Sequence, residues 1–181
     1  FYLGIRVVRR FYKFPAPSFT LYFLDSRLRT MMQSSDKIIE RSGIKKGITV
    51  MDLGCGPGIY TIDVARIVGD KGKVYAVDIQ KTMIDRLEKK LKKPENKDIR
   101  NIIPIVASAY ELPVPDNSVD LVYMITVLAE IPDKEKALKE VNRILKDDGI
   151  LSVSEFITDP DYPLRRTTKK WCESAGFKLK E

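Results

Sequence analysis

Three alternate glycines, Gly54, Gly56 and Gly58, follow an acidic residue, Asp52, with only Leu53 between them. Glycines at this spacing allow a tight turn and let a ligand approach the backbone where a side chain would collide. Dinucleotide-binding proteins use G-x-G-x-x-G to present a helix amino terminus to a pyrophosphate. Here the spacing is G-x-G-x-G next to a carboxylate, which favours a ligand with a cationic group over a phosphate.

A second acidic residue, Asp78, ends the apolar run 73–78. A carboxylate at this point can accept hydrogen bonds from both hydroxyls of a ribose. The simpler alternative is that Asp78 only caps a helix starting at Gln80 and Lys81, a role worth about 1 kcal/mol. Asp78 ends the next expected strand after the glycine loop, and for this reason we favour ribose binding over capping alone. S-adenosylmethionine combines a ribose with an ammonium and a sulfonium and has no phosphate.

Candidates for the chemical step follow the apolar run 119–125. Glu130 is the best candidate for a base or a cation-orienting group, since the chain contains no histidine, the commonest general base. The alternative is that Glu130 is a surface residue just before a helix. We expect the acceptor site near Thr126, Leu128, Glu130 and Phe156, at the ends of the fourth and fifth strands.

Two residues near these motifs are expected to be structural. Cys55 lies inside the glycine loop and is predicted to fill space, not to act as a nucleophile. Tyr123 lies in an apolar run and is predicted to pack in the core. Because Cys55 and Cys172 form no CxxC pair, the sequence predicts neither a disulfide framework nor a metal site, and a reduced, cytoplasmic setting.

Alternating strands and helices are expected to position these residues. Short β-branched runs predict buried strands over 48–53, 73–78, 101–106, 119–125 and 150–156. Apolar residues at helical spacing predict the helices between them. The first helix is expected over 57–68 and is closed by Gly69, and the second has Met83, Leu87 and Leu91 on one face and stops before Pro94. The third runs from the N-cap Asp133 through Leu145 and is followed by a turn at 147–149. The last has Asp159 as its cap and Pro160 at its first position, and it buries Leu164, Trp171 and Ala175.

This order of elements predicts an α/β fold: a doubly wound, mostly parallel sheet with helices on both faces. Ligands in such sheets bind outside the carboxyl ends of the strands. Pro104 interrupts the third strand and predicts an edge position. The connection to the fourth strand is too short for a full helix, so one face should be thinner there. Gly176–Leu179 would open a further strand.

Taken together, the motifs resemble a known family. The segment 50–58 is similar to the first motif of Rossmann-like class I S-adenosylmethionine-dependent methyltransferases, in the form of a type 11/25-like domain, and 74–78 is similar to the second. The segments 111–121 and 145–151 resemble the family's entries into the fourth and fifth strands. The resemblance covers roughly residues 36–179. The family's last, antiparallel strand is missing, so we expect a fragment or truncated form.

The resemblance implies S-adenosylmethionine as the cofactor and in-line transfer of its methyl group. It implies that backbone around Gly54 and Gly56 holds the methionine part, that Asp78 holds the ribose and that Ile79 packs on the adenine. Where the family commonly has Asp or Asn to meet the adenine amino group, this chain has Ser108 before Ala109, and serine can still accept that bond. The expected cofactor contacts are Asp52, Gly54, Cys55, Gly56, Gly58, Asp78, Ile79, Ser108 and Ala109.

Residues 1–35, before the expected methyltransferase domain at 36–181, are aromatic and basic. They hold eight of the chain's 16 aromatic residues (one Trp, eight Tyr and seven Phe), interleaved with Arg6, Arg9, Arg10 and Lys13. Three alternatives stay open: a helix packed on the core, a lid whose Tyr22 contacts the acceptor, and a helix on an anionic lipid surface.

A formal net charge of +7 could attract phosphates, a lipid surface or an acidic substrate. The leading hypothesis is an enzyme that methylates a small or lipid-like molecule. The alternatives are a nucleic-acid methyltransferase or RNA-binding protein, based on the basic stretch 86–100, and a non-catalytic subunit that binds S-adenosylmethionine. Nucleic acid is not favoured, because a lysine-rich helix face is more simply a solvated one. The abundance of Lys, Glu, Ile and Val is typical of heat-adapted proteins.

Overall fold

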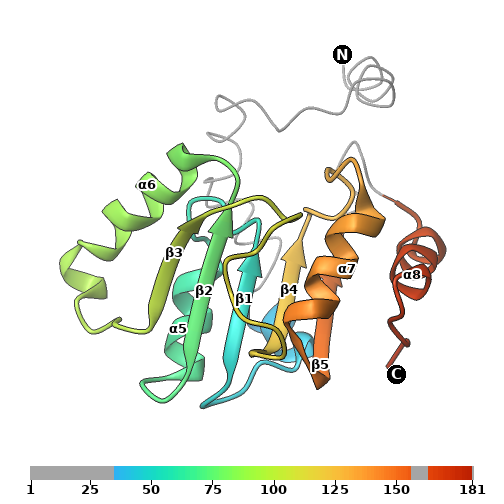
Figure 1. Cartoon of the computed structure of the whole chain (residues 1–181). Coiled ribbons are helices and arrows are strands. Elements are labelled where there is room, and N and C mark those ends of the chain that lie inside the picture. Colours follow the sequence, from blue (N-terminus) through green and yellow to red (C-terminus); the bar gives the residue numbers. More distant parts are fainter. Residues whose placement is uncertain (1–34, 156–162, 181) are drawn as a thin grey trace.

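The computed structural model describes residues 35–155 and 163–180, which form a five-stranded sheet between two layers of helices (Figure 1). The strands are β1 (Thr49–Leu53), β2 (Lys73–Asp78), β3 (Ile102–Val106), β4 (Val119–Ile125) and β5 (Leu145–Ser154). The helices are α4 (Ser35–Ser42), α5 (Thr61–Val68), α6 (Lys81–Leu91), α7 (Lys134–Ile144) and α8 (Arg165–Ser174), with a short 3₁₀ helix η2 (Pro94–Asn96).

The strand order is β3-β2-β1-β4-β5, and every neighbouring pair is parallel. The chain runs outward from β1 through β2 to β3, and then returns to the other side of β1 to add β4 and β5. The order therefore reverses between β1 and β4, and the crevice at such a switch point is where ligands of open α/β sheets bind. The α/β prediction and the edge position predicted for the strand with Pro104 are confirmed.

Side chains along the buried strands alternate between the two helical layers, as the period of two requires. Val50 of β1 packs on the layer of α4 and α5, whereas Met51 packs on the layer of α7 and α8. α6 joins the first layer through Ile84 and Leu87, which contact Ala76. Each such side chain contributes about 1.5–3 kcal/mol when fully buried. Within the described residues, no helix is long and apolar enough to cross a membrane.

Several local predictions are confirmed in detail. Asp133 caps α7 by accepting a hydrogen bond from the Lys136 backbone N–H (3.0 Å). Gly69 closes α5 with a positive φ of 67°. The connection from β3 to β4 contains no helix, so that α7 covers this face of the sheet at β1, β4 and β5 but not at the β3 edge.

Three element limits predicted from the sequence are wrong. The segment 57–60 is a turn, so α5 begins only at Thr61. Leu145 adopts extended angles and pairs with Val119 in place of continuing α7, and a bulge absorbs 146–149 before Ile150 pairs with Leu121. Leu164 is 70% exposed because it precedes α8 in place of lying on its inner face.

The segment 176–179 forms no strand; the chain that leaves α8 is held against α7, where the Asn142 side chain donates to the Ala175 carbonyl (3.3 Å). Trp171 and Ala175 do pack on the core, as predicted. Phe156, Asp159 and Pro160 lie outside the described residues.

Candidate functional site

The predicted site residues gather at one edge of the sheet. Because all five strands are parallel, their carboxyl ends and the loops that follow lie on the same side, at the top of Figure 1. The glycine loop follows β1, Asp78 and Ile79 end β2, Ser108 and Ala109 follow β3, and Thr126 and Glu130 follow β4. Four separate segments of the sequence are thereby brought to one crevice.

The amide groups of the glycine loop are directed into the protein. Both Gly54 and Cys55 donate their backbone N–H to the Val77 carbonyl (2.8 and 3.0 Å). Gly58 donates to the Cys55 carbonyl (3.0 Å), and Gly56 donates to Oδ2 of Asp78 (2.9 Å). Since phosphate-binding loops rely on free N–H donors, this loop is not suited to an anion. The carbonyl oxygens of the loop are better suited to a cationic ligand.

The three glycines differ in what surrounds them, although all have a positive φ of 53–80°. A side chain at Gly54 would collide with Val127 of the loop after β4, and one at Gly58 would collide with Leu87 of α6. These two glycines therefore serve close packing. Of these three, only Gly56 has no atom of the described residues within 4 Å of the place a Cβ would occupy. The open space at Gly56 is where a ligand can approach the loop.

Asp52 is a buried carboxylate beneath this loop, with only 4% of its surface exposed. Its Oδ2 accepts a hydrogen bond from the Thr61 hydroxyl (2.6 Å) at the start of α5. Burial raises the pKa of Asp52 to about 6, with a small contribution from Asp78, while the hydroxyls of Thr61 and Tyr123 act in the opposite direction. Within the described residues Asp52 forms no ion pair. A buried carboxylate without a cation beside it is a natural partner for a cationic ligand.

Asp78 joins the glycine loop to the start of α6. One carboxylate oxygen accepts from Gly56 N–H and the other from the backbone N–H of Gln80 (2.8 Å). Burial raises the pKa of Asp78, and these two hydrogen bonds lower it. The predicted capping role and a role next to the ligand are thus compatible, because each carboxylate oxygen has a further lone pair to accept from a ribose hydroxyl.

Cys55 is buried inside the loop, as the sequence predicted for a space-filling residue. Burial raises the pKa of its thiol far above the usual range, and the carboxylates of Asp52 and Asp78 add to this effect. The thiol is therefore protonated at any physiological pH. A nucleophilic role requires the thiolate, so Cys55 packs against α6 without taking part in chemistry.

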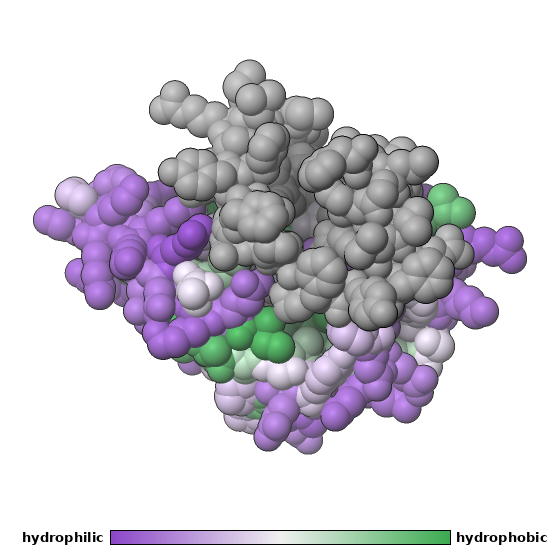
Figure 2. Space-filling view, turned by 90° about the horizontal axis from the view of Figure 1, so that it is seen from above, coloured by the Kyte–Doolittle hydropathy of each residue, from purple (hydrophilic) through white to green (hydrophobic). Residues whose placement is uncertain are grey.

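An apolar surface lies beside Asp78. Ile79 is 62% exposed and Val106, at the end of β3, is 49% exposed, which is high for large apolar side chains. The view from above shows exposed apolar surface among hydrophilic side chains (Figure 2). Ser108 uses its hydroxyl to accept from the Tyr110 backbone N–H (3.2 Å), and Ala109 packs on the core. A flat aromatic group could lie on Ile79 in this position.

The loop after β4 holds the residues expected to meet a second substrate. Thr126 has a positive φ of 58°, an uncommon conformation for a β-branched residue that costs of order 1–3 kcal/mol and is often found at functional sites. Glu130 is half-buried and donates its backbone N–H to Val127 (3.0 Å). Leu128, between these two residues, is fully buried in the core. Tyr22 lies outside the described residues.

The family model for a methyltransferase domain matches residues 44–179, which contain every element of this crevice. The chain belongs to this family. A ubiquinone/menaquinone biosynthesis C-methyltransferase from Vibrio campbellii is 40% identical over 125 residues, 67% of this chain and 48% of that protein. The corresponding enzyme from Psychromonas ingrahamii is 39% identical over 128 residues, 71% and 50% of the two chains. This chain thus spans about half the length of the curated relatives it matches.

Among solved structures, an S-adenosylmethionine-dependent methyltransferase from Aquifex aeolicus superposes with a TM-score of 0.80 at 27% identity. The match covers 90% of this chain and 89% of the other. S-adenosylmethionine is the cofactor of this methyltransferase family, and the crevice fits it. The buried Asp52 suits its cationic end, the open face of Gly56 leaves room for it, and Asp78 and Ile79 suit its ribose and adenine.

Two charged residues of the methyltransferase crevice escaped the sequence analysis. Lys134, at the first turn of α7, is only 9% exposed and donates to the carbonyls of Ala129 (3.2 Å) and Ile131 (2.6 Å). Glu155, just after β5, accepts from the Ala129 N–H (3.3 Å). Lys134 thus contacts the carbonyls of the residues on either side of Glu130, whereas Glu155 contacts the residue before it. A lysine in a helix otherwise rich in surface lysines gives no sequence signal of burial.

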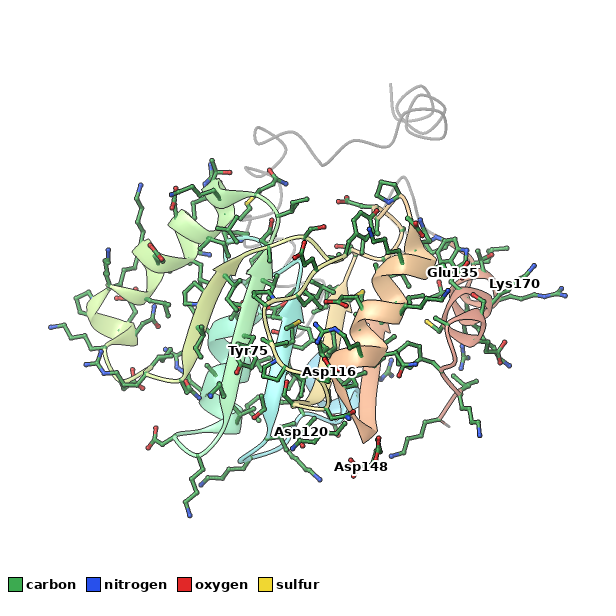
Figure 3. The ribbon with its side chains drawn as sticks, in the orientation of Figure 1. Tyr75, Asp116, Asp120, Glu135, Asp148 and Lys170 are labelled. Carbon is green, nitrogen blue, oxygen red and sulfur yellow. The ribbon has the colours of Figure 1, made fainter. Side chains whose placement is uncertain are left out.

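Two acidic residues, Asp120 and Asp148, lie far from this crevice (Figure 3). Figure 3 labels Asp120 and Asp148 at the lower end of the sheet, opposite to the site. Asp120 pairs with Lys146 (2.6 Å) and accepts from the Thr49 backbone N–H (2.8 Å). These contacts connect the amino ends of β1 and β4 to β5, so Asp120 has a structural role.

Proposed function

We propose that this domain transfers the methyl group of S-adenosylmethionine to a small, lipid-like acceptor of the quinone class. The observation that carries the proposal is the pair of buried carboxylates, Asp52 and Asp78, on either side of the open Gly56. The acceptor class is supported by relatives named for C-methylation in ubiquinone and menaquinone biosynthesis, at 37–40% identity.

Each residue of the crevice has a proposed role. Asp52 faces the ammonium and sulfonium end of the cofactor, Asp78 accepts from the ribose hydroxyls, and Ile79 packs on the adenine. The remaining proposed cofactor contacts are Gly54, Cys55, Gly56, Gly58, Ser108 and Ala109. On the acceptor side we propose Tyr22, Thr126 and Glu130, with Glu130 as the base or the group that orients the acceptor.

Methyl transfer mainly requires that the acceptor is aligned with the methyl group of the cofactor. When bound, S-adenosylmethionine supplies an electrophilic methyl group. In a C-methylation, an electron pair of the acceptor ring would form the new C–C bond, the electron pair of the S–C bond would remain on the leaving thioether sulfur, and the ring carbon would then lose its proton. The loop after β4 must hold that ring in line with the methyl group and exclude water, which can lower the barrier by roughly 7–11 kcal/mol. Glu130 would take the proton.

Calorimetry with S-adenosylmethionine tests the donor half. We expect Asp78→Ala to weaken binding at least tenfold, because the ribose loses its acceptor and Gly56 N–H loses its partner. The matched control is Asp85→Ala, which removes an exposed carboxylate on α6 that pairs only with Lys81. Equal affinity of the Asp78 variant and the intact protein would exclude the proposed site.

Methyl transfer tests the acceptor half. The intact protein is incubated with methyl-labelled S-adenosylmethionine and three acceptors in parallel: a quinol that lacks one ring methyl group, total RNA and total lipid extract. Label in the quinol or the lipid fraction supports the proposal. Label in RNA would replace it with nucleic-acid methylation, and cofactor binding without any transfer would favour a non-catalytic subunit.

A further inference from the structure

The Tyr123 hydroxyl is a buried polar group that the packing role predicted for this residue does not explain. Tyr123 is 2% exposed, and within the described residues its hydroxyl has no hydrogen-bond partner of good geometry. A phenylalanine would fill the same space without burying an unpaired hydroxyl, which is costly. The hydroxyl therefore calls for a reason other than packing.

The strand register places this hydroxyl beside Asp52. In the parallel pair of β1 and β4, Asp52 is the direct partner of Tyr123, and on the opposite flank its partner in β2 is Ala76. Ala76 offers only a methyl group. Among the described residues, the polar side chains next to this carboxylate are Tyr123 of β4 and Thr61 of α5, whose hydroxyl already donates to Oδ2.

The electrostatic surroundings of Asp52 are unfavourable to its charge. Within the described residues, the other titratable groups that face it are the Asp78 carboxylate at the end of β2, the Cys55 thiol of the loop, and Tyr123 itself. None of these is a cation. Thr61 donates a full hydrogen bond to this carboxylate. The Tyr123 hydroxyl makes no hydrogen bond of good geometry, but it is close enough to lower the pKa of Asp52 that burial has raised.

We propose that Tyr123 is a positioning residue of the cofactor site, whose hydroxyl keeps the Asp52 carboxylate ionised and oriented toward the cationic end of S-adenosylmethionine. The inference rests on the proposed function, since it needs that cofactor. It adds a residue from β4 to a site otherwise built from the ends of β1 and β2. Cofactor affinity should then change with pH as Asp52 titrates. Removal of the Tyr123 hydroxyl should change cofactor affinity because it changes the pKa of Asp52.

The test is the pH profile of cofactor affinity, measured by calorimetry with S-adenosylmethionine from pH 5 to 8.5. For the intact protein we expect constant affinity above the pKa of Asp52, near pH 6, and a loss of about tenfold per pH unit below it, because one proton competes with the cation. Tyr123→Phe should move the break upward by about one pH unit, the size expected for one hydrogen bond to a carboxylate.

Tyr75→Phe is the matched control. Tyr75, labelled in Figure 3, also lies in a central strand, but it packs on the opposite face of the sheet from Tyr123. This variant should keep the profile of the intact protein. Carbon-13 NMR of the aspartate carboxyls, without cofactor, gives a second readout in which only Tyr123→Phe should raise the pKa of Asp52.

The outcomes separate the two levels of the proposal. Identical pH profiles for Tyr123→Phe and the intact protein, with cofactor bound by both, would overturn the role of Tyr123 alone. Failure of the intact protein to bind S-adenosylmethionine at any pH would overturn the proposed function, and this inference with it. Thermal unfolding at pH 8 verifies that each variant is folded.

Discussion

Gly54 and Gly56 share a left-handed backbone but have different neighbours. A methyl group at Gly54 would collide with Val127, whereas a methyl group at Gly56 would meet no atom of the described residues. Both substitutions to alanine cost about 1–2 kcal/mol for the backbone alone. The collision at Gly54 adds about 1–3 kcal/mol of overpacking. The two glycines should thus separate stability from ligand binding.

We therefore predict that Gly56→Ala unfolds in urea with a stability loss of about 1–2 kcal/mol but binds S-adenosylmethionine at least tenfold more weakly. Gly54→Ala should lose roughly 2–5 kcal/mol of stability. Urea unfolding and calorimetry on both variants make the measurement. If Gly56→Ala binds the cofactor as tightly as the intact chain does, the cofactor does not bind in the space next to Gly56.

At the residue scale, the sequence predicted what depends on neighbours along the chain. The glycine loop and Asp78 were found because their spacing and strand ends are local properties. The split of the Asp78 carboxylate between Gly56 and Gln80 was not predicted, since it depends on how the loop folds back over β2. Tyr123 was correctly predicted as buried, but the meaning of its hydroxyl follows only from the register of β1 against β4.

At the element scale, the loop after β4 is held from two sides. Glu155, just after β5, accepts a hydrogen bond from the Ala129 N–H, and Lys134 of α7 donates to the carbonyls of Ala129 and Ile131. The Lys134 ammonium also lies over the Trp171 ring of α8, 4.8 Å from its centroid. A buried ammonium is stable only with such partners. The loop that carries Glu130 is therefore fixed to β5, α7 and α8 at once.

Lys134→Met should make this loop more mobile and leave cofactor binding unchanged. We expect the KM for the quinol acceptor to rise about tenfold, with the affinity for S-adenosylmethionine within about twofold, because misplacement of an aligned reactant costs up to about 10²-fold. Hydrogen exchange of the amides at 129–131 should become faster. Lys136→Met is the control, since Lys136 is exposed on the same helix and its ammonium lies over the Tyr110 ring (5.2 Å). Equal exchange rates in the two variants would exclude the clamp.

The helices and strands were predictable where a local pattern is bounded on both sides. β2 and β4 have the predicted limits, because each is a β-branched run between turn residues. Leu145 was assigned to the preceding helix because a leucine at the junction satisfies the helical period as well as the strand, and only its pairing with Val119 decides between them. Leu164 was misplaced because its exposure depends on how α8 docks on α7.

For the molecule as a whole, the cofactor crevice concentrates unfavourable charge. Asp52 and Asp78 are both buried, and burial raises the pKa of each. A raised folded-state pKa means that the folded protein binds the proton more tightly than the unfolded chain does. The contribution of Asp52 to stability is therefore fully present below its ordinary pKa of 3.8, and it is lost as the pH rises through about 6.

Asp52→Asn should consequently stabilise the protein without cofactor at neutral pH. A change in pKa from 3.8 to about 6 corresponds to about 3 kcal/mol, so the variant should gain on the order of 2–3 kcal/mol at pH 8 and nothing below pH 4. The amide oxygen can still accept the Thr61 hydroxyl, which limits other changes. Urea unfolding of both proteins at pH 4, 6 and 8 gives the three differences.

The same variant should respond differently to the cofactor. Saturation at 100 times the dissociation constant stabilises a binding protein by about 2.7 kcal/mol, and we expect this gain for the intact chain only. The buried charge of Asp52 would then destabilise the empty crevice and find its partner in the cofactor's cation. A variant that is less stable than the intact protein at pH 8 without cofactor would contradict this account, because the carboxylate would then have a stabilising partner within the fold.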